Sequence, residues 1–291
     1  MQTALQILVT GVQIGAIYVL FSLGLTLTFG VMRIVNFAHG QFFTLSALIV
    51  AALLPMLVSA GWPIALAFAA ASILAIGASL LLGLAVYQWG FRLLQRDFVG
   101  SFILSLGLVL LLEGVYLDVF GGAVRSVPPV IDGTVSILGT ALTTQRLVLC
   151  VVAVLFTALL YGALALTSVG KALRAAAIDH EAAMLQGIPY GRIARQGFLI
   201  ATLLAAVAGV LIAPVSVVTT TLGSDYLIKG FIAVIIGGLG SIPGAIIGSL
   251  FIALIESVGG YFFDPSRASI AIFVLVMLVL LVRPKGLLGH G

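Results

Sequence analysis

The chain has 291 residues, of which 62% are hydrophobic and only 8% are charged. This composition excludes a disordered chain and a soluble enzyme with one membrane anchor. The hydrophobicity is continuous rather than alternating in segments of about ten residues, which argues against an outer-membrane barrel. The composition therefore predicts an all-α polytopic protein, a helical bundle of an inner membrane that forms a single domain over residues 1–291.

Charge-free stretches bounded by Arg, Lys, Pro and Gly mark the expected membrane spans. A bilayer core is crossed by about 20 apolar residues in a helix. The 58 uncharged residues between Arg33 and Arg92 are too many for one helix, and Pro55 with the Gly61-Trp62-Pro63 string divides them. The expected spans are 8–30, 40–58, 63–88, 100–120, 147–167 and 197–217, followed by a Gly-rich broken-helix segment at 227–262 and a last span at 268–282.

Glycines interrupt the segment 227–262, whose middle reads GGLGSIPGAIIG. We expect a short first arm, 227–239, and a full second arm, 244–262. Overlapping GxxxG spacings usually mean close helix packing. A gate is the alternative, because the ends of half-helices often contact solutes in transporters. The glycines in question are Gly237, Gly240, Gly244 and Gly248.

The basic residues determine the expected orientation, since cytoplasmic loops collect Lys and Arg. If the loop 168–196 is cytoplasmic and 227–262 crosses twice, nine basic residues lie inside and four outside. One crossing would make the ratio seven to six. We therefore expect eight to nine crossings, with a periplasmic N-terminus and a cytoplasmic C-terminus. The net charge of +4 reflects this topology and does not indicate a nucleic-acid partner.

The long loop 168–196 predicts a short cytoplasmic helix. Ser168 can cap it, KALRAAAIDHEAAML has high helix propensity, and Gly187 followed by Pro189 is a stop signal. Small side chains would let the helix approach a cleft on another protein, flanked by polar contacts. The alternative is a solvated loop whose alanines favour helix. The candidate contact residues are Arg174, Asp179, His180, Glu181, Ala182, Ala183, Gly187 and Arg192.

Three strings in this chain resemble known permeases. EAAMLQG, Glu181 to Gly187, is similar to the signature by which bacterial ABC importer permeases engage their ATPase subunits. GLTLTFGVMRIVNFAHGQFFTLSA, Gly24 to Ala47, resembles the N-terminal signature of branched-chain amino acid permeases of the LivH type. GGLGSIPGAIIGSLFIALIE, Gly237 to Glu256, resembles a Gly-rich segment of that family and of ribose-type permeases. The resemblance covers nearly the whole chain.

The resemblance implies a division of labour. Members of this family pair with a homologous second permease subunit and two cytoplasmic ATP-binding subunits, and a periplasmic binding protein delivers the substrate. This chain lacks GxxxxGK[ST], since Gly170-Lys171 is followed by Ala172. We therefore expect a non-catalytic transport subunit in contact with membrane lipid, with no cofactor of its own, because the partners use the ATP.

Polar residues between the first two spans form the string NFAHG. Asn36, His39 and Gln41 either lie in a cytoplasmic turn, with Asn36 capping the second helix, or line the substrate path in a broken-helix element. The histidines His39, His180 and His290 are scattered, without Cys or acidic partners at ligand spacing. No metal site is expected.

The ionisable residues within the spans are few. Glu113 and Glu256 are expected near the membrane interfaces, with a proton relay as the alternative. Asp225 and Lys229, four residues apart, are expected to form a surface pair, with a contact to the binding protein as the functional alternative.

The sequence thus predicts a permease subunit of an ABC importer for branched-chain or related amino acids. Another small polar solute, such as an amide or urea, is the alternative within this class. A self-contained secondary transporter or channel is the alternative from another class, and it would require paired intramembrane charges or an inverted repeat.

Overall fold

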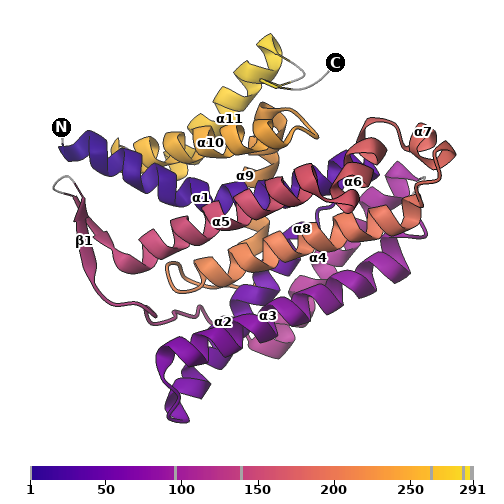
Figure 1. Cartoon of the computed structure of the whole chain (residues 1–291). Helices are drawn as coiled ribbons and strands as arrows, with labels where there is room; N and C mark the ends of the chain where they lie inside the picture. The colour runs from indigo at the N-terminus through magenta and orange to yellow at the C-terminus, as the bar shows by residue number, and fades with distance from the viewer. Residues whose placement is uncertain (1, 95–96, 138–139, 263–264, 284–285, 289–291) are drawn as a thin grey trace.

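The computed structural model describes residues 2–94, 97–137, 140–262, 265–283 and 286–288. In these residues the chain is a helical bundle with one short hairpin (Figure 1), as the composition predicts. Its α-helices are α1 Gln2–Met32, α2 His39–Ser59, α3 Ile64–Val86, α4 Phe98–Phe120, α5 Thr144–Leu166, α6 Ser168–Ile178, α7 His180–Leu185, α8 Tyr190–Ile212, α9 Leu222–Gly237, α10 Ile242–Phe262 and α11 Pro265–Val282.

Seven helices in the described residues are long and apolar enough to cross a membrane. They are α1, α2, α3 with its π-helical extension Tyr87–Phe91, α4, α5, α8 and α10. α9 has 16 residues and is shorter than a full span. The seven long helices with α9 and α11 are compatible with the expected eight to nine crossings.

Some helices begin or end at residues other than the expected ones, most often near a proline or a glycine. Pro55 lies inside α2 and does not break it, and the helix ends at Ser59, just before Gly61, which has a φ of 89°. α8 begins at Tyr190 and ends at Ile212, before Pro214, which has no N–H to donate. α9 begins at Leu222, five residues earlier than the expected arm.

The segment between α4 and α5 contains a hairpin that the sequence pattern did not predict. β1, Thr134–Ile137, pairs antiparallel with β2, Thr140–Thr143, and Thr134 lies opposite Thr143. This hairpin and the N-terminus lie at one end of the molecule, whereas α6 and α7 lie at the other (Figure 1).

The core lies along α1, α2, α8, α9 and α10, while α3, α4 and α5 cover its outside. Phe21 and Leu20 of α1 are fully buried, and Phe198 of α8 packs edge to face on Phe42 of α2. The outer helices expose large apolar side chains; Leu110 of α4 is 73% exposed. An apolar surface of this kind is the one that lipid or another membrane subunit covers.

The helices α9 and α10 pack backbone to backbone. A Cβ atom on Gly237 would collide with the carbonyl of Gly244, and one on Gly248 would collide with the carbonyl of Ala233. Gly240, with a φ of 82°, lies in the turn between the helices, and a Cβ there would be 3.8 Å from the Cα of Gly30. The expected broken helix is therefore a tight helical pair.

The end of the described chain returns to this pair. Leu287 N donates to Ile236 O over 2.7 Å, and Leu288 N donates to Gly237 O over 3.0 Å. Gly237 is the last residue of α9 and Gly240 contacts the end of α1, so this C-terminal segment lies where α1 ends. Because Gly237 lies against Gly244 and Ala233 lies against Gly248, the two arms of 227–262 run in opposite directions. This arrangement agrees with two crossings.

The connection between α1 and α2 turns back into the bundle. Arg33 has a φ of 54°, and α2 begins at His39, whose Nε2 donates to Phe21 O over 3.2 Å. Phe21 lies 11 residues before the end of α1, about 16 Å along the axis. α2 therefore starts deep in the protein. The cytoplasmic-turn interpretation of His39 and Gln41 is wrong, because both belong to this buried helix.

Candidate coupling cleft and substrate path

The helix α6 is fastened to the end of α5. Gly170 N donates to Thr167 Oγ1 over 3.0 Å, so Thr167, and not Ser168 as predicted, caps α6. A Cβ on Gly170 would collide with the backbone of Ala163 and Leu164, so only glycine permits this approach. Arg174 Nη1 donates to Leu164 O. Arg174, a predicted contact residue, is thus tied to the bundle.

Asp179 divides the predicted single helix into α6 and α7. Its side chain accepts hydrogen bonds from Glu181 N over 2.9 Å and Ala182 N over 3.1 Å, which is the geometry of an N-cap. The bonds from Ala182 N and then Glu181 N hold the pKa of this carboxyl below its usual range. Gly187, with a φ of 82°, ends the segment as expected.

The residues of α7 differ in what they present to the outside. Glu181 and Ala182 are exposed, and so is Leu185, which is 86% exposed and was not among the predicted contact residues. A Cβ on Gly187 would meet no atom within 4 Å. Ala183 is buried at 6% exposure and bonds through its carbonyl to Ile188 N. Ala183 therefore cannot make the external contact predicted for it.

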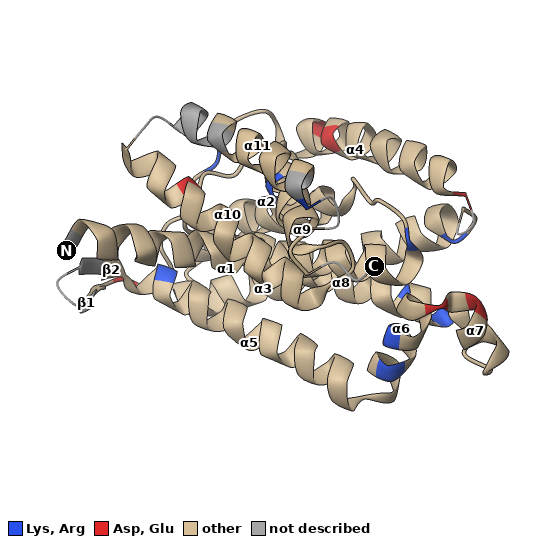
Figure 2. Cartoon of the chain, turned by 90° about the horizontal axis from the view of Figure 1, so that it is seen from above, with Lys and Arg blue, Asp and Glu red and all other residues tan. Residues whose placement is uncertain are grey.

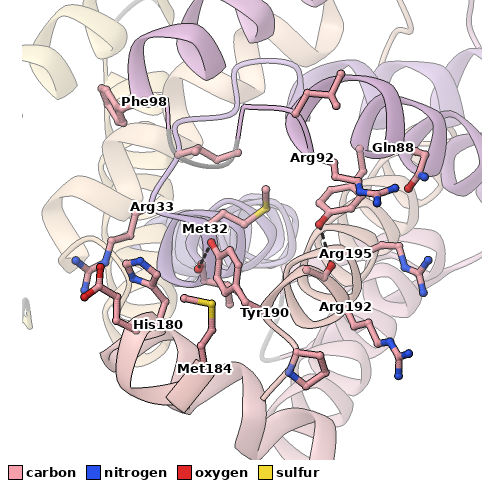
Figure 3. A pocket seen from close by; sticks show the side chains of 17 residues that line it. Met32, Arg33, Gln88, Arg92, Phe98, His180, Met184, Tyr190, Arg192 and Arg195 are labelled. Atoms are coloured by element: carbon pink, nitrogen blue, oxygen red, sulfur yellow. Dashed lines mark hydrogen bonds between the residues drawn. The ribbon is translucent and has the colours of Figure 1, made fainter. Parts of the chain in front are cut away.

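A cleft of about 1100 Å³ lies beside α7 (Figure 3). Arg192 and Arg195 extend from α8 on one side of it, and Arg33 lies next to His180 on the other (Figure 3). Arg33 Nη2 donates to Ile178 O over 3.2 Å, which links the end of α1 to the end of α6. Arg92 also lines the cleft.

The four arginines of this cleft come from three parts of the chain that are far apart in sequence: Arg33, Arg92, and the start of α8 with Arg192 and Arg195. Figure 2 shows several Lys and Arg residues around α6 and α7 at one end of the molecule, and others elsewhere. These four arginines are among the nine basic residues expected on the cytoplasmic side, and the structure brings Arg33, Arg92, Arg192 and Arg195 to one cleft. His180 and Glu181 line the same cleft, so α7 forms one of its walls.

The predicted path residues lie deep in the bundle. Asn36, His39 and Gln41 are each at most 2% exposed. Asn36 does not cap α2, because the N-cap is Ala38 and no side chain bonds to the first turn. Asn36 Oδ1 and Gln41 Oε1 have no hydrogen-bond partner among the described residues. These two acceptors favour the broken-helix interpretation, in which such groups line a solute path.

A carboxylate lies where α2 and α9 begin. Ser224 Oγ donates to Glu113 Oε1 over 2.5 Å, and Gln41 Nε2 donates to the same oxygen over 3.2 Å. Nearby, Gly223 N donates to Thr44 Oγ1 over 2.8 Å, and the backbones of Gly40 and Gly223 are in contact. We call Gln41, Glu113 and Ser224 the polar junction. Glu113 is therefore bonded to α2 and α9, which its place near a helix end did not predict.

A family model described as "Branched-chain amino acid transport system / permease component" matches residues 7–282. The chain belongs to this family. It is 30% identical over 303 residues to the high-affinity branched-chain amino acid transport system permease protein LivH of Escherichia coli K12, covering 98% of this chain and 96% of that protein. It is 31% identical over 297 residues to the permease protein BraD of Pseudomonas aeruginosa, again covering 98% and 96%.

A more distant relative is the probable branched-chain amino acid transport permease protein LivH of Methanocaldococcus jannaschii, 26% identical over 286 residues. No solved structure matches the chain. Membership in the branched-chain amino acid permease family confirms the predicted resemblance and the prediction of a non-catalytic, multi-pass transport subunit. A component of a transport system works with partner subunits, as the resemblance also implied.

The permease pairs its charges differently from the expected pattern. Lys229 forms an ion pair with Glu256 of α10 and not with Asp225. Tyr18 of α1 donates to the other carboxylate oxygen of Glu256 over 2.5 Å, and its ring lies 5.8 Å from Lys229 Nζ. Glu256 is therefore bonded to residues of both α1 and α9. Tyr226 contacts the edge of the Tyr18 ring.

Sequence reasoning did not find Ser224, Tyr116 or Tyr18. Tyr116 Oη donates to Gln41 O over 3.0 Å, and Ser224 lies 111 residues from the carboxylate it contacts. No local spacing reveals such pairs, because they depend on how the helices cross. Among the described residues, no group of three His, Cys, Asp or Glu side chains could hold a metal ion.

Proposed function

We propose that the chain is the transmembrane permease subunit of an ATP-driven ABC importer that moves branched-chain or related amino acids inward across a bacterial inner membrane. The family match over residues 7–282 supports this proposal. The identities of 30% and 31% to proteins named as branched-chain amino acid permeases support the substrate class. The binding protein, rather than the permease, would select among the amino acids of that class.

The coupling proposal is supported by the exposed tip of α7. Glu181, Ala182 and Leu185 are exposed at the end where the basic cleft opens. Together with Gly187 they offer an apolar and small-residue surface beside charges, which suits docking into a cleft on an ATPase subunit. Closure of two ATPase subunits on ATP would then move the docked helices together, and the permease would follow by rigid-body rocking.

The partners follow from the same proposal. A homologous second permease and membrane lipid would cover the apolar outer faces of α3, α4 and α5. Of the two cytoplasmic ATP-binding subunits, one would dock at α6 and α7 of this chain and the other at the second permease, and a periplasmic binding protein would dock at the opposite end, near the β1–β2 hairpin. ATP belongs to the partners, so the chain itself needs no cofactor.

The proposed orientation places the cleft in the cytoplasm. The cleft arginines, Arg33, Arg92, Arg192 and Arg195, lie beside α7, and cytoplasmic loops collect such residues. The N-terminus lies at the end opposite α7 (Figure 1), so in the proposed orientation it would lie in the periplasm. The segment 286–288 bonds to the end of α9, so in the same orientation the C-terminal end of the described chain would lie in the cytoplasm.

Reconstitution tests this function. The complete complex in liposomes should take up leucine with ATP, and the permease without its ATPases should not. Ala182→Trp and Gly187→Trp should abolish uptake while ATP hydrolysis and membrane insertion persist. Gly187→Asn is the matched control, because asparagine tolerates the positive φ and stays small. Wild-type uptake in both Trp variants would overturn the coupling proposal, and uptake by the permease alone would indicate a secondary transporter.

A further inference from the structure

The polar junction holds more acceptors than donors. Glu113 offers a carboxylate with two oxygens, and Gln41 Oε1 has no partner among the described residues although its side chain is only 1% exposed. The one ion pair found in the described residues is Lys229 with Glu256, so no cationic side chain neutralises Glu113 there. A buried unpaired acceptor next to a carboxylate without a counter-ion marks a place for a cationic donor.

The surroundings of the junction add two further features. α2 begins at His39 and α9 begins at Leu222, so two helix N-termini meet at Glu113. Gln41 Nε2 and Ser224 Oγ, both in the first turns of these helices, donate to Glu113 Oε1. Helix N-termini and these two donors favour a carboxylate. The junction thus combines groups for an anion with two acceptors for a cation.

A zwitterionic amino acid carries both of the missing groups. Its ammonium has three N–H donors and no acceptor, which suits Glu113 and Gln41 Oε1. We propose that the polar junction is the intramembrane subsite that holds the α-ammonium of the transported amino acid. In this structure, Glu113 accepts hydrogen bonds from Gln41 and Ser224. When substrate arrives, those donors turn to its carboxylate and Glu113 pairs with its ammonium.

The packing of α4 permits such an exchange. α4 carries Glu113 and packs mainly on α2, while most of its length is exposed. Glu113 itself is half-buried. By contrast, Gly40 and Gly223 lie backbone against backbone, which fixes the two helix starts relative to each other. The starts of α2 and α9, which are fixed relative to each other, carry the donors. The more exposed helix α4 carries the carboxylate.

The inference rests on the proposed function, and uptake by the reconstituted complex tests both. Glu113→Gln keeps the size of the side chain and removes its charge, and it should lower the rate of leucine uptake about tenfold or more. Asp118→Asn is the matched control, because Asp118 is an exposed carboxylate on the same helix; this variant should keep the wild-type rate. A wild-type rate in Glu113→Gln would overturn the inference alone. Absence of leucine uptake by the wild type would overturn the proposed function.

Ligand-dependent thermal stabilisation of the wild-type permeases with their ATPases, in the absence of the binding protein, keeps the inference testable if Glu113→Gln does not fold. Leucine and leucinamide, which both carry the ammonium, should raise the melting temperature. 4-Methylpentanoate, which lacks the ammonium, should not. Equal stabilisation by all three compounds would overturn the inference, and so would stabilisation by sodium chloride without any amino acid. Glu113→Asp should retain part of the leucine effect, because the charge remains on a shorter side chain.

Discussion

Lys229 of α9 and Glu256 of α10 form an ion pair between two helices whose backbones touch farther along their length. The side chains are 27% and 24% exposed, so the pair lies mostly inside the protein. Tyr18 donates to the carboxylate from α1, so three helices meet at Glu256. A charge in this position needs its partner, because removal of one member leaves the other unpaired in a poorly solvated site.

The first prediction concerns this pair. Lys229→Met should lower the free energy of unfolding of the permease by about 1–3 kcal/mol, because Glu256 is left without its cation. The double variant Lys229→Met/Glu256→Met should lose less than Lys229→Met alone. Lys171→Met, on an exposed position of α6, should change stability little. Thermal unfolding of the purified variants measures these differences, and a double variant less stable than the single one would contradict the prediction.

The second prediction concerns the contact between α9 and α10. Gly244→Val should destabilise the permease by about 3 kcal/mol or more, because a Cβ there would collide with the carbonyl of Gly237. Gly260→Val lies in the same helix, and a Cβ there would meet no atom within 4 Å. It should accumulate in the membrane like the wild type. The amounts of folded protein in isolated membranes, measured by size-exclusion chromatography, compare the two, and equal amounts would argue against the backbone contact.

The third prediction concerns the cap of α7 and its dependence on pH. The pKa of Asp179 is lowered in the folded protein, so the capping contribution is complete above the unfolded pKa of about 3.9. It is lost as the pH falls through the lower, folded pKa. Between pH 5 and pH 8 the cap should therefore not change.

Hydrogen exchange at the amides of Glu181 and Ala182 measures this cap. Asp179→Ala should exchange faster than the wild type at neutral pH, and Asp179→Asn should stay close to it, since asparagine also caps helices. Comparison of wild type with Asp179→Asn at each pH cancels the intrinsic pH dependence of exchange. A difference that appears near neutral pH would show that Asp179 titrates there and would contradict the lowered pKa.

The fourth prediction concerns orientation. In a Cys150→Ser background, Leu185→Cys and Trp62→Cys each introduce one accessible thiol at opposite ends of spans. A membrane-impermeant maleimide should label Trp62→Cys in intact spheroplasts, and it should label Leu185→Cys only in inside-out vesicles. The reverse pattern would invert the proposed topology while leaving the fold unchanged.

Most spans could be predicted because charge is costly in lipid and therefore marks their ends. The break at 238–241 was also predictable, since glycines accumulate there. The start of α2 was predicted within one residue, but its depth was not, because NFAHG is polar and typical of a loop, yet the folded chain buries it against α1. His39 can lie there because its ring nitrogen reaches the Phe21 carbonyl, a contact that only the folded bundle creates.

The candidate site was predictable only in part. Gly187 and Asp179 act locally, as a helix stop and a cap, so residue types and spacing indicated this region. Glu113 was recognised as an unusual charge, but its partners come from other helices. Lys229 was predicted to pair with Asp225 because helical spacing allows that pair. In the folded protein it forms an ion pair with Glu256 of another helix. Pairings between distant helices depend on crossing geometry, which a single sequence does not encode in any short pattern.

The attachment of α6 decides where a force on α7 is felt. Gly170 lies against the backbone of Ala163 and Leu164, and Arg174 is bonded to Leu164, so α6 cannot swing on the end of α5. Leu173 of the same helix packs near Gly197 of α8. Under the proposed function, a displacement of α7 by an ATPase subunit would therefore be transmitted to both α5 and α8. Helices that do not contact α6, such as α4, would move only through their packing on other helices.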